Sequence, residues 1–306
     1  MRSVPVVLAL LCASGFAARA EPPRLDEPTL RANEAYDNRN YPEALRLYRR
    51  AAENGADPQA EIRLGMMYSQ GLGVAPDGAE AIRWFRKAAD QGSAQGQFNL
   101  AISYRSGDGV ERDYGEALRW FYAAAQQGYA PAEFNLGFMY QSGEGTARNA
   151  PEAARWYRAA ADHGLAPAQA ALGNQYLVGA GVPRDHAQAL AWFRKAADQG
   201  NAAAQYAVGS AYDSGDSVKR DYAEALRWLT LAAEQNFAPA QFAVGDFYDR
   251  GFGVARDPAR AREWMDKAAA GGDDRAKKWL AAHPAPSPAP AKTAAPAPAA
   301  ANRPMH

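Results

Sequence analysis

Residues that commonly carry chemistry are scarce in this sequence. Its 306 residues include a single cysteine, Cys12, and four histidines, His163, His186, His283 and His306. One cysteine cannot form an internal disulfide, and no two histidines stand at the spacing of a metal-binding motif. We therefore expect no metal, no cofactor and no catalytic residue.

An excess of charge of either sign is also missing. The 34 lysines and arginines equal the 34 aspartates and glutamates, so the full chain is formally neutral. Loss of residues 1–20 would remove Arg2 and Arg19 and leave two more acidic than basic side chains. Because nucleic acids and anionic membranes attract basic surfaces, this balance argues against both as partners.

Long apolar runs are absent as well, and the longest lies at the N-terminus. It extends from Val4 to Ala13, follows Arg2 and precedes an A-x-A site that ends at Ala20. This run is too short to span a bilayer, and the three features together are typical of a secretory signal peptide. Leu11 stands before Cys12, where a lipoprotein signal usually has a small residue, so we favour cleavage after Ala20 over lipid attachment. The protein is then periplasmic or secreted.

What the sequence does contain is a repeat of 36 residues. Six of the seven tryptophans recur at this interval: Trp84, Trp120, Trp156, Trp192, Trp228 and Trp264. Self-similarity at such a period indicates stacked structural repeats. The six full repeats lie roughly at 57–92, 93–128, 129–164, 165–200, 201–236 and 237–272.

Each repeat carries the signals of two helices. In the third repeat Leu136 and Tyr140 share one face of the first helix, and a Gly-x-Gly loop follows. The second helix of the preceding repeat opens with Asp113 and Glu116 at the spacing of a capping box, and it stops at a glycine, Gly128. Recurrent glutamates and arginines three residues apart predict surface ion pairs. We expect the tryptophans to pack between the helices.

Both ends of the repeat array depart from this pattern. Residues 21–56 contain an atypical copy, which we interpret as an N-terminal capping half-repeat. Residues 273–283 predict one more helix that caps the C-terminal end. The stretch 284–306 alternates alanine and proline and offers few groups to bury, so it predicts a disordered tail.

The repeat motifs resemble those of the Sel1-like repeat family, which is related to the tetratricopeptide repeat. The resemblance rests on Leu-Gly-x-x-Tyr, the Gly-x-Gly-Val loop, Asp-Tyr-x-Glu-Ala-Leu-x-Trp-Phe and Ala-Ala-x-x-Gly, and it covers about 57–272. It implies an all-α fold, a right-handed α/α superhelical solenoid with terminal capping helices. Exported bacterial members are implicated in envelope regulation, exopolysaccharide assembly and host contact. One branch has a disulfide in every repeat and is associated with β-lactam-like ligands, but this chain lacks those cysteines.

The resemblance also implies where a partner binds, because the first helices of such repeats line a concave groove. Residues beside the Leu-Gly-Tyr stripe vary between repeats, as expected of a surface that is free from stacking. We predict that the following residues bind the partner: Arg63, Met66, Asn99, Ile102, Arg105, Asn135, Phe138, Gln141 and Asn174. Apolar anchors with nearby donors suit an extended peptide that bears acidic groups.

The resulting hypothesis is an exported, non-enzymatic and monomeric adaptor that binds a protein or peptide such as an envelope sensor or an assembly protein. A second hypothesis is a scaffold for exopolysaccharide or cell-envelope assembly, in which the groove holds glycan or assembly proteins. A third, an envelope enzyme that binds or hydrolyses β-lactam-like ligands, would need a nucleophile, a base and an orienting group that converge in space.

Overall fold

The computed structural model describes residues 27–55 and 57–284, and their regular structure consists of fifteen helices without a strand. The predicted signal peptide and the tail from residue 285 onward lie outside the described residues. The helices are α1 (Glu27–Asp37), α2 (Tyr41–Gly55), α3 (Pro58–Gln70), α4 (Gly78–Asp90), α5 (Ala94–Ser106), α6 (Tyr114–Ala125), α7 (Ala130–Ser142), α8 (Ala150–Asp162), α9 (Ala166–Val178), α10 (His186–Asp198), α11 (Ala202–Ser214), α12 (Tyr222–Glu234), α13 (Ala238–Arg250), α14 (Pro258–Ala270) and α15 (Asp274–Ala282).

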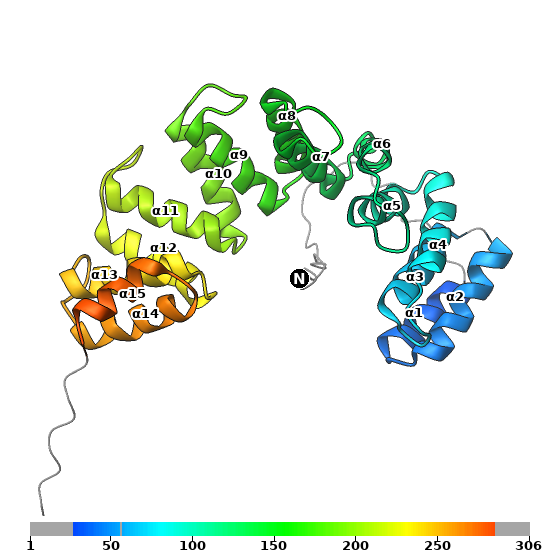
Figure 1. Ribbon diagram of the computed structural model, residues 1–306, viewed down its shortest axis with the longest axis horizontal. Coiled ribbons are helices and arrows are strands. Elements are labelled where there is room, and N and C mark those ends of the chain that lie inside the picture. Colours follow the sequence, from blue (N-terminus) through cyan, green and yellow to red (C-terminus); the bar gives the residue numbers. More distant parts are fainter. Residues whose placement is uncertain (1–26, 56, 285–306) are drawn as a thin grey trace, which may run out of the picture. The chain divides into compact units, whose positions relative to one another are not determined.

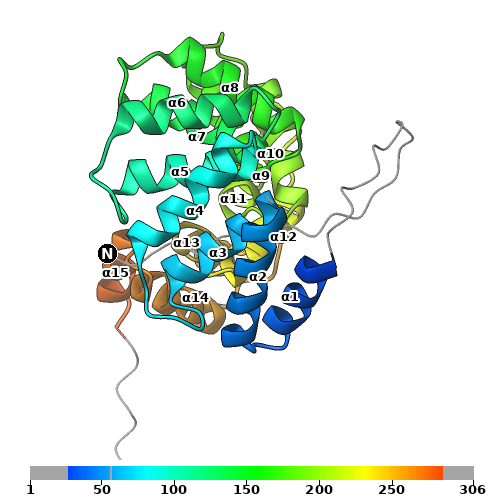
Figure 2. The same ribbon diagram turned by 90° about the vertical axis from the view of Figure 1, so that its right-hand side faces the viewer.

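These helices belong to two compact units, residues 1–163 and 164–306, which we call the N-terminal and C-terminal units. Within each unit the helices pack in chain order as antiparallel pairs, beginning with α1 against α2 and with α9 against α10 (Figures 1 and 2). The closing helix α15 packs on α14. Each pair therefore buries its apolar face against its neighbours, which confirms the predicted solenoid arrangement of all-α repeats.

The caps of the second helices follow the sequence prediction in one of two respects. The Asp113 side chain accepts hydrogen bonds from the backbone N–H groups of Gly115 and Glu116 at 2.8 and 3.0 Å. The reciprocal bond of a capping box is not made, because the N–H of Asp113 donates to the Tyr104 carbonyl at 2.9 Å. The Glu116 carboxylate instead pairs with Arg119 at 2.7 Å. The backbone hydrogen bond from Asp113 to Tyr104 fixes the start of α6 on the end of α5, and the equivalent bond is present in the other repeats.

The glycines that follow the first helices take the left-handed backbone conformation, as predicted, and residues other than glycine take it elsewhere. Gly107 and Gly143 end their helices with φ of 78° and 83°, in the left-handed region that favours glycine. Ser217 and Asn236 take the same region, with φ of 61° and 63°, although they are not glycines.

The tryptophans pack between helices as predicted, but their burial is uneven. Trp84, Trp156 and Trp192 are buried, whereas Trp120, Trp228 and Trp264 are half-buried. A Lys or Arg side chain lies over each indole, as Lys195 does at 3.7 Å from the Trp192 ring centroid.

The residue after each tryptophan is buried in every repeat. This column consists of Phe85, Phe121, Tyr157, Phe193, Leu229 and Met265. It packs on the glycine of the Leu-Gly-x-x-Tyr motif, because a Cβ atom on Gly137 would lie 2.6 Å from Tyr157 Cδ1. The small residue therefore makes room for the neighbouring ring or chain, as close helix packing requires.

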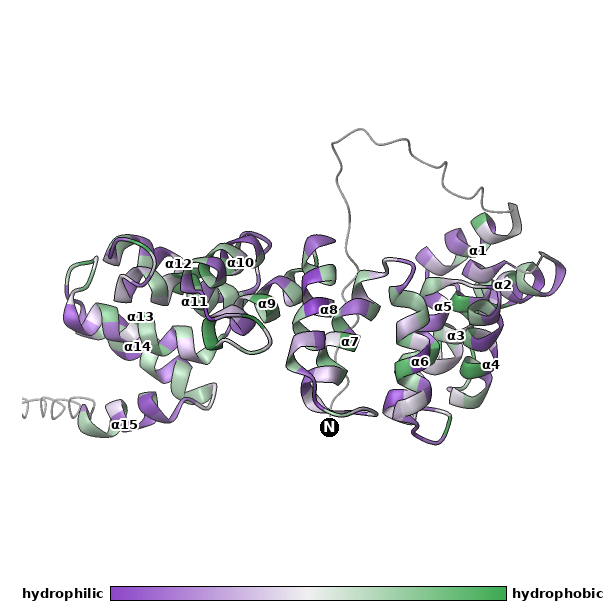
Figure 3. Ribbon diagram, turned by 90° about the horizontal axis from the view of Figure 1, so that it is seen from above, coloured by the Kyte–Doolittle hydropathy of each residue, from purple (hydrophilic) through white to green (hydrophobic). Residues whose placement is uncertain are grey.

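Another column consists of buried polar side chains and joins the helices near their ends; we call it the amide column. It contains Glu61, Gln97, Glu133, Gln169, Gln205 and Gln241. Gln205 Nε2 donates to the Ala197 carbonyl of the preceding repeat at 3.2 Å, and its Oε1 accepts from Gln235 at 2.7 Å. Satisfied polar groups of this kind add directionality to an otherwise apolar stack. Figure 3 shows that polar and apolar residues alternate along the helices.

No described helix has both the length and the apolar character needed to cross a membrane.

Candidate binding surfaces

Four of the predicted partner-binding residues meet on one surface of the N-terminal unit. Ile102 and Arg105 lie on α5, and Asn135 and Phe138 lie on α7. Together with Glu144, from the loop after α7, they form what we call the α5–α7 patch. Ile102 and Phe138 are 37% and 36% exposed, so two large apolar side chains face solvent close to charged ones.

Arg105 organises this patch through three contacts. Its Nε donates to Glu144 Oε2 at 2.8 Å, and its Nη1 donates to Asn135 Oδ1 at 3.1 Å. The guanidinium carbon also lies 4.6 Å from the centre of the Phe138 ring. A guanidinium held on an aromatic face and by two acceptors loses little further entropy when a ligand binds it. These contacts leave Nη2 as a donor for a ligand.

A hollow of about 260 Å³ opens beside Arg105. Its lining consists of Ile102, Arg105, Ser106, Tyr114 and Glu144. The hollow is somewhat smaller than a typical small-molecule pocket, and it has room for one or two side chains of a peptide.

The other predicted residues do not join the patch in the same way. Arg63 lies over the Tyr36 ring at 5.4 Å, and Met66 packs against the core formed by α1 to α5. The Asn99 Nδ2 atom is buried without a hydrogen-bond partner. Gln141 is exposed, but its Oε1 accepts from the Tyr157 hydroxyl at 2.6 Å. Three of these four side chains thus have structural contacts of their own.

Glu144 is the member of the α5–α7 patch that the sequence prediction did not include. It stands between the two glycines of a Gly-x-Gly loop, a position that otherwise holds Leu72, Asp108, Ala180, Asp216 or Phe252. Variation at one position inside an otherwise constant loop was the available signal. That the side chain would reach Arg105, 39 residues earlier, depends on the packing of α5 against the next repeat.

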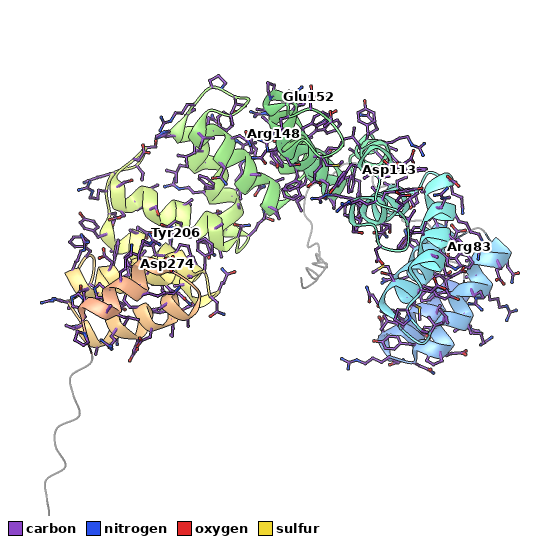
Figure 4. All side chains as sticks on the ribbon, viewed as in Figure 1. Arg83, Asp113, Arg148, Glu152, Tyr206 and Asp274 are labelled. Carbon is purple, nitrogen blue, oxygen red and sulfur yellow. The ribbon has the colours of Figure 1, made fainter. Side chains whose placement is uncertain are left out.

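Asn174 lies instead in the C-terminal unit, where it lines a cavity of about 410 Å³ between α9, α10 and α11. We call this the α9–α11 cavity. Its walls are largely apolar and include Leu177, Leu190, Phe193, Tyr206 and Phe237. Figure 4 marks Tyr206 on α11.

Polar groups gather at one part of the α9–α11 cavity. His186 Nδ1 lies 2.5 Å from Asp216 Oδ2, and Arg184 Nε lies 2.9 Å from His186 Nε2. Asp216 occupies the same loop position as Glu144 in the other unit. Among the described residues no group of three or more His, Cys, Asp or Glu side chains could hold a metal ion.

Comparison with known proteins identifies the repeats. The Sel1 repeat model matches residues 37–55, 58–93, 94–129, 130–165, 166–201, 202–237 and 238–273. The full matches begin one residue later than the repeats predicted from the tryptophan period. The search of curated proteins found no match.

Two solved structures have similar folds and sequences. One is a protective antigen present in uropathogenic Escherichia coli strains that displays an SLR fold, at 36% identity and a TM-score of 0.76 over 84% of this chain. The present chain spans only 56% of that protein. The other is a Sel1 repeat protein from Oxalobacter formigenes, at 32% identity and a TM-score of 0.69, with 80% of this chain and 97% of that chain covered.

Proposed function

Because the chain belongs to the Sel1 repeat family, we propose that it is a binding scaffold whose α5–α7 patch holds an extended peptide with acidic groups. Sel1 repeat proteins generally mediate interactions between proteins and are typically not enzymes. The proposal assigns that general role to one surface of this chain and to one class of ligand.

The observation that carries the proposal is the combination of exposed apolar anchors with a prearranged cation. Ile102 and Phe138 present apolar area to solvent, while Arg105 is held between Glu144, Asn135 and the Phe138 ring. Aromatic and arginine side chains at the centre of an interface commonly dominate its binding energy. Glu144 already offsets part of the arginine charge, so an acidic ligand would share the guanidinium through Nη2 rather than replace Glu144.

The test is a double variant, Phe138→Asp with Arg105→Glu, compared with Leu231→Asp. Leu231 is 37% exposed on the second helix α12, so the control makes the same apolar-to-acid change away from the patch. We expect the double variant to keep its helical circular dichroism and to lose partner capture, because loss of two central contacts costs about 2 kcal/mol or more.

Partners are captured by photo-crosslinking in intact cells from a reactive residue placed at position 138 and, separately, at position 231. The proposal predicts a partner linked through position 138 alone, and mass spectrometry identifies it. Equal yields from the two positions, or undiminished recovery of that partner in a pull-down with the Phe138→Asp/Arg105→Glu variant, would remove the α5–α7 patch from consideration.

We also propose that the protein is exported and acts in the cell envelope. The charged start, the apolar run and the A-x-A site of residues 1–20 support export. The similar E. coli protein is a protective antigen, and antibodies reach proteins outside the cytoplasm most readily. Sequencing of the mature N-terminus should find Glu21 as the first residue, and recovery of chains that begin at Met1 would contradict export.

The carbohydrate alternative finds less support. Indole rings that bind sugars must be open to solvent. Three of the six repeat tryptophans are buried, and the other three are half-buried with a Lys or Arg side chain over the ring. No described feature of the α5–α7 patch favours glycan over peptide.

A further inference from the structure

Three small side chains of α11 line the α9–α11 cavity at positions where several other first helices carry larger ones. Ala207 stands in the column that holds Arg63, Asn99 and Asn135 in the N-terminal unit. Ser210 stands in the column of Met66, Ile102 and Phe138, and Ala211 in the column of Met67, Met139 and Phe247. All three small residues line the cavity. The missing side-chain volume is therefore concentrated on one face of one helix.

The walls that remain around this space are aromatic or aliphatic. Phe193 comes from α10, Tyr206 from α11 and Phe237 from the turn before α13, and the Tyr206 and Phe237 rings pack with centroids 5.6 Å apart. Grooves lined by aromatic side chains are the usual binding sites of proline-rich segments in the polyproline II conformation. Such segments bind with little loss of entropy, because proline already restricts the backbone.

We propose that the alanine- and proline-rich segment 285–306 of this same chain binds in the α9–α11 cavity. The segment contains six prolines and nine alanines, so it offers pyrrolidine rings and methyl groups of a size that suits a cavity of about 410 Å³. Its only charged side chains at neutral pH are Lys292 and Arg303, and it has no acidic residue.

Charge at the cavity is compatible with that segment. Asp216 lines the cavity, so one carboxylate is close to the place where a lysine or arginine would arrive. Arg184 contacts His186 beside this carboxylate, and Arg220 donates to the Ser214 carbonyl, so the attraction is local and modest.

The segment can reach the cavity from its point of attachment in the C-terminal unit. Neighbouring helices pack at roughly 8–10 Å, so the four steps from α15 back to α11 amount to about 40 Å at most. A segment of 22 residues in polyproline II conformation extends about 68 Å at 3.1 Å per residue. Reach therefore does not limit the contact, and tethering gives the segment an effective concentration of about millimolar.

The experiment uses the full chain with a photo-reactive amino acid at Asn174, which lines the cavity, or at Val178. Val178 is 67% exposed on the same helix and does not line the cavity, so it is the matched control. After irradiation, peptide mass spectrometry should find position 174 linked to residues 285–306 and position 178 not linked to them. An equal mixture of isotopically light and heavy chains should give links only within one chain.

A variant that fills the cavity completes the test. Ser210→Phe introduces the residue that stands in this column at Phe138, and we expect it to lower the crosslink at least about tenfold. If circular dichroism shows that this variant is misfolded, Ala207→Asn takes its place, since asparagine occupies that column at Asn99 and Asn135.

Four results would overturn the proposal. They are the absence of crosslinks to 285–306, equal linkage from positions 174 and 178, linkage that survives filling of the cavity, and links between light and heavy chains, which would show a second copy as the occupant.

Discussion

Replacement of Gly137 by alanine tests whether the buried column after the tryptophans determines the spacing of the helices. Helix propensity alone favours the change, because glycine in a helix interior costs about 1 kcal/mol relative to alanine. The tertiary structure opposes it. The new Cβ would lie 2.6 Å from Tyr157 Cδ1 and 2.7 Å from Tyr157 Cε1, well inside van der Waals contact.

The Tyr157 ring cannot easily move away from this contact. It is 2% exposed, it packs against the Phe134 ring with centroids 5.6 Å apart, and its hydroxyl donates to Gln141 Oε1 at 2.6 Å. Overpacking of this kind costs about 1–3 kcal/mol, and a weakened hydrogen bond costs about 1 kcal/mol more. After subtraction of the propensity gain, we expect Gly137→Ala to lower the free energy of unfolding by about 1–3 kcal/mol.

Urea denaturation followed by circular dichroism measures the loss, and a second substitution identifies its cause. Tyr157→Met reproduces the pair formed by Gly245 and Met265 in the C-terminal unit, where an added Cβ would lie 3.0 Å from the end of the flexible methionine side chain. Alanine at 137 should therefore cost less in the Tyr157→Met background than in the natural chain. Ala101→Gly, at the one repeat that has alanine in this column, serves as the control and should lose about 1 kcal/mol through propensity. A higher urea midpoint for Gly137→Ala would refute the reasoning.

Three further predictions concern other columns. Trp156→Ala should cost about 3–5 kcal/mol of unfolding free energy and Trp228→Ala clearly less, because only the first indole is buried; equal losses in urea titrations would contradict this. Burial raises the pKa of Glu61 to about 7, so its protonated form stabilises the fold at low pH and stability falls as pH rises from about 4.5 through 7. Glu61→Gln should remove that fall and add about 1–3 kcal/mol to the free energy of unfolding at pH 8. If the urea midpoints of the variant and the natural chain change in parallel with pH, this explanation is wrong. Ser217→Gly should raise the free energy of unfolding by about 0.5 kcal/mol, since Ser217 has φ of 61°, and an unchanged or lower melting temperature would show that this loop is not strained.

Local rules predicted the elements of this fold because each of them acts within a few residues. The caps at Asp113 and Asn149, the left-handed stops at glycines and the helix pairs all follow from hydrogen bonds and sterics between near neighbours in sequence. The repeat period then predicted that each pair packs on the next, and within each unit it does. A period shared by six copies restricts how the pairs of one unit stack.

The limits of sequence reasoning appear where contacts join residues of different helices. The tryptophans mark the period, yet Tyr157 and its counterparts, one position later, fill the space against glycine, because only the angle between two helices decides which neighbour points inward. The N–H of Asp113 likewise chooses the Tyr104 carbonyl over the Glu116 side chain once α5 and α6 are packed.

The candidate sites divide in the same manner. Variation along the first helices was enough to select Ile102, Arg105, Asn135 and Phe138, because residues released from stacking are free to differ between repeats. That Glu144 would join Arg105, and that small side chains on α11 would open a cavity at Asn174, depended on distances across 30 residues or more. Such distances are set by packed volume rather than by any local pattern, and so the tertiary structure alone decided them.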